Sequence, residues 1–317
     1  MNGLVKECLV MTSESLPPSS LSRRKAMFAL ADLVLLSACG GTADPNCKSN
    51  VALDSSLSSL VGNGKVATKP DTLTALPVGT AGAVQTRGYV EYVPPGYSSK
   101  CKWPVIICLH GDGEFGDGKS AAALQPFWNM CLTYEITANN WDAQKRFIVL
   151  APQFSSYEDR SADNVNAFIQ FAKANYAIDT TRIYLTAVSG GGVALGNYLN
   201  KYSGGEAAAV LPVACYVPPV SLAGVSKWKN VPVWLLCGSA DTTVGVGNVM
   251  NVYNYLVTAN APVSPRVTLF TGLGHQWEVA SDAYSPATNT HPFDATNGTV
   301  TLTPYGNIYD WLLQYHR

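Results

Sequence analysis

From about Gln85 onward, short apolar runs alternate with longer stretches in which apolar residues recur at helical spacing. A short apolar run between turn signals is typical of a buried strand, and a 3.6-residue period is typical of an amphipathic helix. The pattern predicts strands at residues 88–93, 104–109, 147–151, 182–188, 209–216, 231–237 and 266–270. It predicts helices at residues 163–176, 192–202, 249–259 and 308–315. Strands separated by helices favour an α/β fold, with a mainly parallel sheet and helices on both faces.

The region before this alternation has a different composition. Residues 40–84 are rich in Ser, Thr, Gly and Ala and show no sustained period, which is typical of a tether, and we expect it to become ordered near the domain. Residues 85–317 are expected to form one domain, without an internal repeat. Because the chain is 47% apolar and only 14% charged, it can bury a large core.

The N-terminal segment has the features of an export signal. The basic block SRRK at residues 22–25 precedes a mostly apolar run, residues 26–38, that is short for a bilayer span. The run leads into LSACG, which resembles a bacterial lipobox, and the arginine pair resembles a twin-arginine signal. We therefore expect residues 1–39 to direct export to the periplasm or outer cell envelope, where a lipid on Cys39 is the expected membrane attachment. The alternative is an ordinary first helix.

Charge and composition limit the partners. The formal net charge is −1 and the sequence has no basic stripe, so nucleic acid is not an expected partner. No group of Cys and His has zinc spacing, and we expect neither a metal nor a cofactor. The seven Trp and sixteen Tyr either pack in the core or line a cleft for an apolar or sugar-bearing ligand. The sequence does not indicate an oligomeric state.

Six cysteines remain once Cys8 is removed with the signal and Cys39 is assigned to the lipid. Cys47 and Cys101 lie in polar segments and form the expected disulfide, given an oxidising compartment. Three others lie in apolar strand-like runs, where a free thiol behaves as a small apolar side chain: Cys108, Cys215 and Cys237.

One stretch, YLTAVSGGGVALG at residues 184–196, places a serine between a predicted strand and three glycines. A strand–turn–helix corner exposes the side chain at its tip, and small residues two positions before and after allow the close approach that the corner needs. Here these residues are Ala187 and Gly191, and the serine is Ser189. We therefore predict Ser189 as a nucleophile, at the carboxyl edge of the sheet where chemistry gathers in this type of fold.

A serine nucleophile needs a base, and a carboxylate must orient that base. His275 follows the strand at residues 266–270, and Asp241 follows the strand at residues 231–237. Both therefore belong to the same sheet edge as Ser189, and we predict them as base and acid. Asp282 is the competing carboxylate, but it comes after His275 in the chain. The remaining histidines are His110, His291 and His316.

The charged intermediate of acyl transfer needs backbone N–H donors, which form an oxyanion hole. We expect one donor from Gly190, directly after the serine. The second is expected from Asp112 in the loop HGDG, residues 110–113, that follows another strand. His110 is expected to brace this loop.

The stretches LHGDGEFGDG, TAVSGGG, LLCGSADTTV and GLGHQWE together resemble an α/β-hydrolase of the secreted carboxylesterase type. They are similar to the group of dienelactone hydrolases, feruloyl esterases and "predicted peptidases". The resemblance covers residues 85–317, and it implies an α/β-hydrolase catalytic domain with Ser189, Asp241 and His275 as nucleophile, acid and base. The sequence departs from the usual G-x-S-x-G pattern because Ala187 stands at the first glycine position.

The substrate is less well defined than the reaction. Trp277, Phe154, Trp128 and Glu114 are candidate substrate contacts, although each could simply pack or face solvent. Residues 281–303 are expected to form a long loop that could cover the site. No large lid helix is visible, which favours short-chain, aryl or polymer-linked esters over long-chain fats. The alternatives are a serine peptidase of the same fold and a non-catalytic module that binds polysaccharide.

Overall fold

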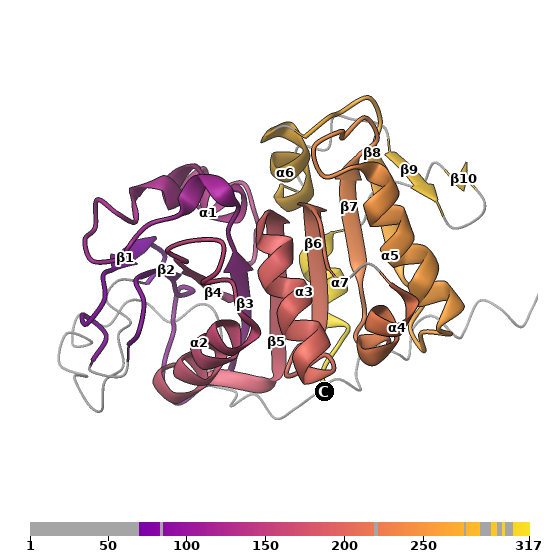
Figure 1. Ribbon diagram of the computed structural model, residues 1–317. Helices are drawn as coiled ribbons and strands as arrows, with labels where there is room; N and C mark the ends of the chain where they lie inside the picture. The colour runs from indigo at the N-terminus through magenta and orange to yellow at the C-terminus, as the bar shows by residue number, and fades with distance from the viewer. Residues whose placement is uncertain are drawn as a thin grey trace, which may run out of the picture. The chain divides into compact units, whose positions relative to one another are not determined.

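The centre of the fold is a sheet of ten strands in the order β1-β2-β4-β3-β5-β6-β7-β8-β9-β10 (Figure 1). A computed structural model describes residues 70–82, 85–218, 221–275, 277–285, 293–296, 300–301 and 307–317. The strands are β1 (Thr74–Leu76), β2 (Tyr89–Tyr92), β3 (Trp103–Leu109), β4 (Ile148–Pro152), β5 (Ile178–Ser189), β6 (Ala209–Cys215), β7 (Trp234–Gly238), β8 (Arg266–Phe270), β9 (Phe293–Thr296) and β10 (Val300–Thr301). Six neighbouring strands of the sheet, β4-β3-β5-β6-β7-β8, are parallel to one another. The outer pairings β1–β2, β2–β4, β8–β9 and β9–β10 are antiparallel.

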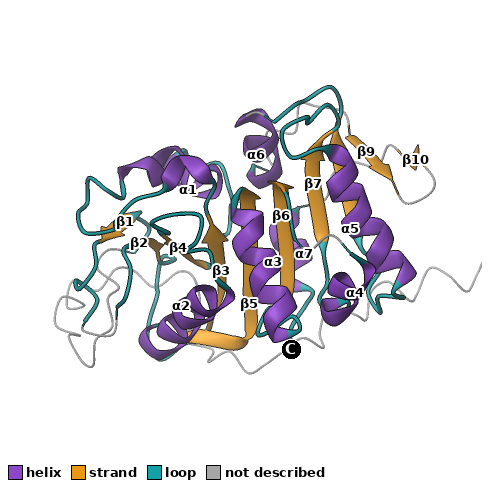
Figure 2. Ribbon diagram, in the orientation of Figure 1, coloured by secondary structure: helices purple, strands orange, loops and turns teal. Residues whose placement is uncertain are grey.

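Helices cover both faces of this sheet (Figure 2). The buried residues of α2 (Ala162–Asn175), α3 (Gly191–Tyr202), α4 (Leu222–Val225), η4 (Ser226–Trp228) and α5 (Val246–Thr258) pack on one face. The buried residues of η3 (Gln125–Asn129), α1 (Cys131–Thr137), α6 (Trp277–Tyr284) and α7 (Ile308–Leu313) pack on the other. The short 3-10 helix η2 (Asp112–Glu114) follows β3.

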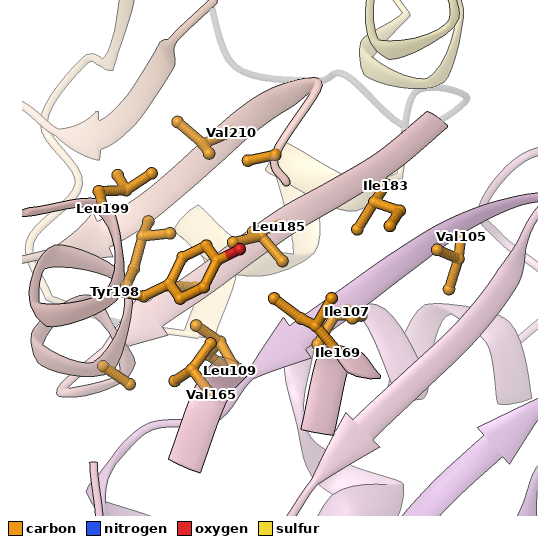
Figure 3. Close-up of a cluster of buried hydrophobic side chains, with 14 of the residues drawn as sticks. Val105, Ile107, Leu109, Val165, Ile169, Ile183, Leu185, Tyr198, Leu199 and Val210 are labelled. Carbon is orange, nitrogen blue, oxygen red and sulfur yellow. The ribbon is translucent and has the colours of Figure 1, made fainter. Parts of the chain in front are cut away.

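Alternation along the strands divides the apolar residues between the two faces. In β3, Val105, Ile107 and Leu109 belong to the cluster beneath α2 and α3, while Ile106 and Cys108 belong to the opposite cluster. Figure 3 shows the first cluster, in which side chains of β3 and β5 meet those of α2 and α3. Each fully buried Val, Leu or Ile contributes about 1.5–3 kcal/mol relative to an exposed one, so these two layers hold the sheet edge in place.

The fold class expected from the pattern is confirmed, and each predicted strand and helix has a counterpart within a few residues. Three parts of the interpretation need correction. The folded domain begins before residue 85, because β1 pairs with β2 and Leu76 is only 4% exposed. The expected loop at 281–303 begins inside α6 and contains β9 and β10. The strand that ends at Ser189 starts at Ile178, earlier than the pattern indicated. The export segment and most of the predicted tether lie outside the described residues.

No helix among the described residues combines the length and the apolar character that a bilayer span requires.

Candidate active site

Ser189 lies at the tip of a sharp turn between β5 and α3. Its φ angle is +51°, in the left-handed region that side chains with a Cβ rarely adopt. Such a backbone conformation costs roughly 1–3 kcal/mol and persists only where the surroundings enforce it. The strain has a direct result, because it turns the hydroxyl away from the ladder of β5 and toward the carboxyl edge of the sheet.

The glycines after Ser189 allow α3 to approach the ends of two strands. A Cβ on Gly191 would overlap the carbonyl oxygen of Leu109, at the end of β3. A Cβ on Gly192 would overlap the carbonyl oxygen of Tyr216, just after β6. Neighbouring backbone cannot move aside as a flexible side chain can, so both positions need glycine. The glycine run therefore fixes the helix start directly beside the strand ends.

His275 contacts Ser189 from the loop that follows β8. Its Nε2 atom lies 2.9 Å from Oγ of Ser189. The loop is held over the end of β7, because the N–H of Ala240 donates to the carbonyl of Leu273 at 2.8 Å. A Cβ on Gly238 would lie 2.5 Å from the carbonyl oxygen of Gly274, so glycine at this position permits the close approach. The ends of β7 and β8 thus deliver the His275 ring to the serine.

The side chain of Asp241 is buried and contacts the opposite edge of the His275 ring. Its Oδ2 atom lies 2.9 Å from Nδ1 of His275, and its Oδ1 atom accepts the N–H groups of Thr243 and Val244 at 3.0 and 2.9 Å. Burial acts to raise the pKa of Asp241, but these hydrogen bonds outweigh it and hold the pKa below its usual value. The carboxylate is therefore ionised at neutral pH. It accepts the Nδ1–H proton of His275, which leaves Nε2 free to accept the Ser189 hydroxyl.

A buried thiol completes the surroundings of the acid. Sγ of Cys237 lies 3.6 Å from Oδ2 of Asp241. Burial, followed by the nearby Asp241 charge, raises the pKa of Cys237 to about 12. The thiol is therefore protonated, and it acts as a weak donor to the same oxygen that binds His275.

The predicted oxyanion donors lie in two loops that meet beside the serine. A Cβ on Gly111 would lie 3.4 Å from Cβ of Ser189, so the loop after β3 passes next to the turn. Among the described residues, the N–H groups of Asp112 and Gly190 have no hydrogen-bond acceptor. Two free N–H groups in loops that flank the serine are what an oxyanion hole requires.

His110 orients one of these N–H groups. Its Nε2 atom accepts the N–H of Phe154 at 2.8 Å, and its Nδ1–H donates to the carbonyl of Gly111 at 2.6 Å. Burial lowers the pKa of His110 to about 3, so the ring is neutral and both contacts fix one tautomer. In a trans peptide the carbonyl and the following N–H point in opposite directions. Holding the Gly111 carbonyl therefore directs the N–H of Asp112 away from the His110 ring.

The four candidate substrate contacts have different surroundings. Glu114 is half-buried, with Oε2 at 3.9 Å from Nδ1 of His110, and burial raises the pKa of its carboxyl group. Trp128 is half-buried and packs against the apolar cluster under η3. The expectation for Phe154 is wrong, because its side chain is 0% exposed and packs on the ring of His110 at 5.3 Å. Trp277 begins α6, and its side chain lies outside the described atoms.

Sequence reasoning missed Arg160, whose side chain contacts both Asp112 and His110. It lies in the loop between β4 and α2, in a polar stretch without period or motif, so no sequence signal marks it. The competing carboxylate, Asp282, belongs to α6 and is buried. Asp241, rather than Asp282, is the carboxylate that contacts Nδ1 of His275.

The cysteines agree in part with the expectation. Cys108, Cys215 and Cys237 are free and buried, as predicted. Cys101 is in a disulfide bond, whereas Cys47 lies outside the described residues, so its pairing with Cys101 stays a prediction. The same holds for Cys39. No group of three or more potential metal ligands occurs among the described residues.

The fold is shared with esterases of known structure. No protein-family model matches the chain. A thermostable esterase of known structure has 20% sequence identity and a TM-score of 0.52 over 78% of this chain. That match spans 63% of the esterase, less than two thirds of its length. The S954A mutant of the feruloyl esterase module from Clostridium thermocellum, complexed with sinapinate, has 13% identity and a TM-score of 0.51. It covers 68% of this chain and 86% of the module. The chain therefore has the α/β-hydrolase fold.

Proposed function

We propose that this protein is a serine esterase that hydrolyses carboxylic esters through an acyl-enzyme. The observation that carries the proposal is the continuous hydrogen-bond chain from Oγ of Ser189 through the His275 ring to Asp241, with both links at 2.9 Å. The three side chains come from the ends of separate strands, and the His275 ring is in the tautomer that can accept the serine proton. This arrangement activates a serine hydroxyl. A buried, ionised Asp241 also stabilises the imidazolium that forms when the proton moves.

The reaction has two halves. Oγ of Ser189 attacks the ester carbonyl carbon while Nε2 of His275 takes the hydroxyl proton. The N–H groups of Gly190 and Asp112 donate to the oxyanion of the tetrahedral intermediate. The C–O bond to the alcohol then breaks, and the alcohol leaves with the proton from His275. Water, activated by the same ring, attacks the acyl-enzyme and releases the carboxylic acid, which restores Ser189.

For the substrate, we propose short-chain, aryl or polymer-linked esters. Among the described aromatic side chains, the half-buried indole of Trp128 remains a candidate to contact the acyl or alcohol group of the substrate. The feruloyl esterase module of the same fold binds sinapinate, an aromatic acid. A suitable substrate panel therefore contains acetyl, butyryl, feruloyl and aromatic polyester substrates.

The proposal includes export and lipid attachment at Cys39, which rest on the basic block and the LSACG motif alone. Mass spectrometry of the mature N-terminus in envelope fractions tests both. A diacylated Cys39 supports the proposal, and an unmodified Cys39 at an intact N-terminus rejects it.

The decisive test of the esterase proposal is Ser189→Ala, assayed on p-nitrophenyl acetate. The expected fall in kcat is at least about 10⁴-fold, because removing the nucleophile of such a unit disables the whole unit. Ser226→Ala is the matched control, since Ser226 is half-buried in the described structure and its hydroxyl donates to the carbonyl of Leu222. Full activity in Ser189→Ala would reject the proposal. Peptide p-nitroanilides cleaved as fast as esters would instead indicate a serine peptidase.

A further inference from the structure

A buried arginine joins the two loops that supply the proposed oxyanion donors. The guanidinium of Arg160 is fully buried, with Nη1 at 2.5 Å from Oδ1 of Asp112 and Nη2 donating to the carbonyl of His110 at 3.1 Å. A buried guanidinium is stable only when acceptors compensate for its lost hydration. Both of its acceptors belong to the loop after β3, so the conformation of that loop is tied to Arg160.

Two further contacts hold Arg160 itself in place. Its guanidinium carbon lies 4.3 Å from the centre of the Phe115 ring, within the range of a cation–π contact. Its carbonyl accepts Nδ2 of Asn197, in α3, at 2.9 Å. Because α3 is the helix that begins beside Ser189, Arg160 is anchored to both sides of the site.

The ion pair also lies directly against the turn of the nucleophile. A Cβ on Gly190 would lie 2.5 Å from Nη1 of Arg160 and would overlap Oδ1 of Asp112. The Arg160–Asp112 pair therefore packs on the Cα atom of Gly190, the residue that supplies the other donor. Asp112 and Gly190, the two residues that supply the candidate donors, are therefore in direct contact.

We propose that Arg160 is a positioning residue that, through the carboxylate of Asp112, sets the spacing of the oxyanion hole formed by the N–H groups of Asp112 and Gly190. The inference rests on the proposed esterase function. Arg160 does not touch the substrate, because its side chain is buried beneath Asp112, whose own side chain is 67% exposed. Lysine cannot replace it fully, since a single ammonium does not reproduce the planar fork that meets two acceptors.

The test compares Arg160→Met and Arg160→Lys by kcat and KM on p-nitrophenyl acetate. Losing one oxyanion donor typically costs 10²–10³ in kcat, so a displaced donor in Arg160→Met should lower kcat by about 10–100-fold. KM should stay within about threefold, since the interaction acts on the transition state. Arg160→Lys should retain an intermediate kcat. The matched control is Arg146→Met, which loses an ion-paired arginine before β4 and should keep its kcat.

A second variant keeps the test valid if Arg160→Met does not fold. Asp112→Ala removes the carboxylate that pairs with Arg160, on a side chain that is 67% exposed, and keeps the Asp112 N–H group. This variant should lower kcat by a similar factor. Where the double variant of Arg160→Met and Asp112→Ala folds, its kcat should be little lower than that of either single variant. A kcat within twofold of wild type in folded Arg160→Met, or in Asp112→Ala, overturns the inference. If Ser189→Ala abolishes hydrolysis while these variants retain it, only the role of Arg160 fails. If wild-type hydrolysis does not depend on Ser189, the proposed function itself fails.

Discussion

The carboxylate of Asp112 fills the space that a methyl group on Gly190 would need. This relationship links two residues 78 positions apart in number, and the fold brings them together only because β3 and β5 are neighbours in the sheet. Glycine is therefore needed directly after the predicted nucleophile because the Asp112 side chain leaves no room for a Cβ atom there. Gly191, by contrast, is required by the backbone of β3.

Gly190→Ala should therefore impair activity more than folding. The added methyl displaces the Asp112 carboxylate from Arg160, and kcat on p-nitrophenyl acetate should fall at least about tenfold. The free energy of unfolding should fall by about 1–3 kcal/mol, as is usual for an overpacked site. Gly247→Ala is the control, because a Cβ there meets nothing within 4 Å in α5, and helical Ala is favoured over Gly. Wild-type kcat in Gly190→Ala would contradict this packing.

Asp241→Asn should keep the shape of the site and lose its chemistry. An amide can present N–H to Nδ1 of His275 and so favour the tautomer that cannot accept the Ser189 proton. A comparable change in a serine protease costs about 10⁴ in kcat, and we expect about 10³–10⁴ here. Steady-state kinetics measures the effect, with Asp163→Asn in the exposed pair with Lys201 as control. A fall of less than tenfold would indicate that another group orients His275.

His110 should make the protein less stable as pH falls. Burial lowers its folded pKa to about 3 from an ordinary 6.5, so between these values the unfolded chain binds a proton that the folded protein excludes. The free energy of unfolding should then decrease by up to about 1.4 kcal/mol per pH unit as pH falls below 6.5.

Urea unfolding between pH 4.5 and 6 tests this linkage. Aspartates with lowered pKa, such as Asp241, change their charge below that range. The raised pKa of Glu114 acts in the opposite direction to His110, because its folded carboxyl binds a proton more readily than the unfolded one. His110→Asn should show a shallower pH slope than wild type, and His316→Asn, at an exposed position, should keep the wild-type slope. Equal slopes in wild type and His110→Asn would mean that His110 is protonated in the folded protein.

The three cysteines that are free in the described part of the chain should resist alkylation in the native state. Cys108, Cys215 and Cys237 are buried, and burial raises the pKa of each thiol. Since the thiolate is the reactive form, iodoacetamide should label them at least about 10³-fold more slowly in native protein than in urea. Peptide mapping by mass spectrometry gives the rates. Fast labelling of Cys237 in native protein would contradict its burial beside Asp241.

The sequence predicted most of the parallel sheet, because its central strands are buried on both faces and appear as continuous apolar runs. It also predicted which side chains meet, since Ser189, Asp241 and His275 each follow a strand whose carboxyl end lies at one edge. Their catalytic roles remain predictions. Three short elements, β1, α1 and α6, gave no recognisable pattern, because three to eight residues are too few to establish a period.

Two contacts between distant segments carried no sequence signal. Arg160 lies 48 residues from Asp112, and only the assembled sheet brings them together. Phe154 follows β4 closely, but the sequence does not reveal that its ring packs under His110 instead of facing the site. In both cases the deciding factor is tertiary packing.

The central claim is that His275 and Asp241 activate Ser189 as a nucleophile. It is tested most directly by treating wild type, Ser189→Ala and His275→Ala with a fluorophosphonate and mapping the adduct by mass spectrometry. The account predicts one adduct per wild-type chain, located on Ser189, with no adduct in Ser189→Ala and a rate at least about 10³-fold lower in His275→Ala. An adduct on another residue, or equal labelling of Ser189 in wild type and His275→Ala, would contradict it.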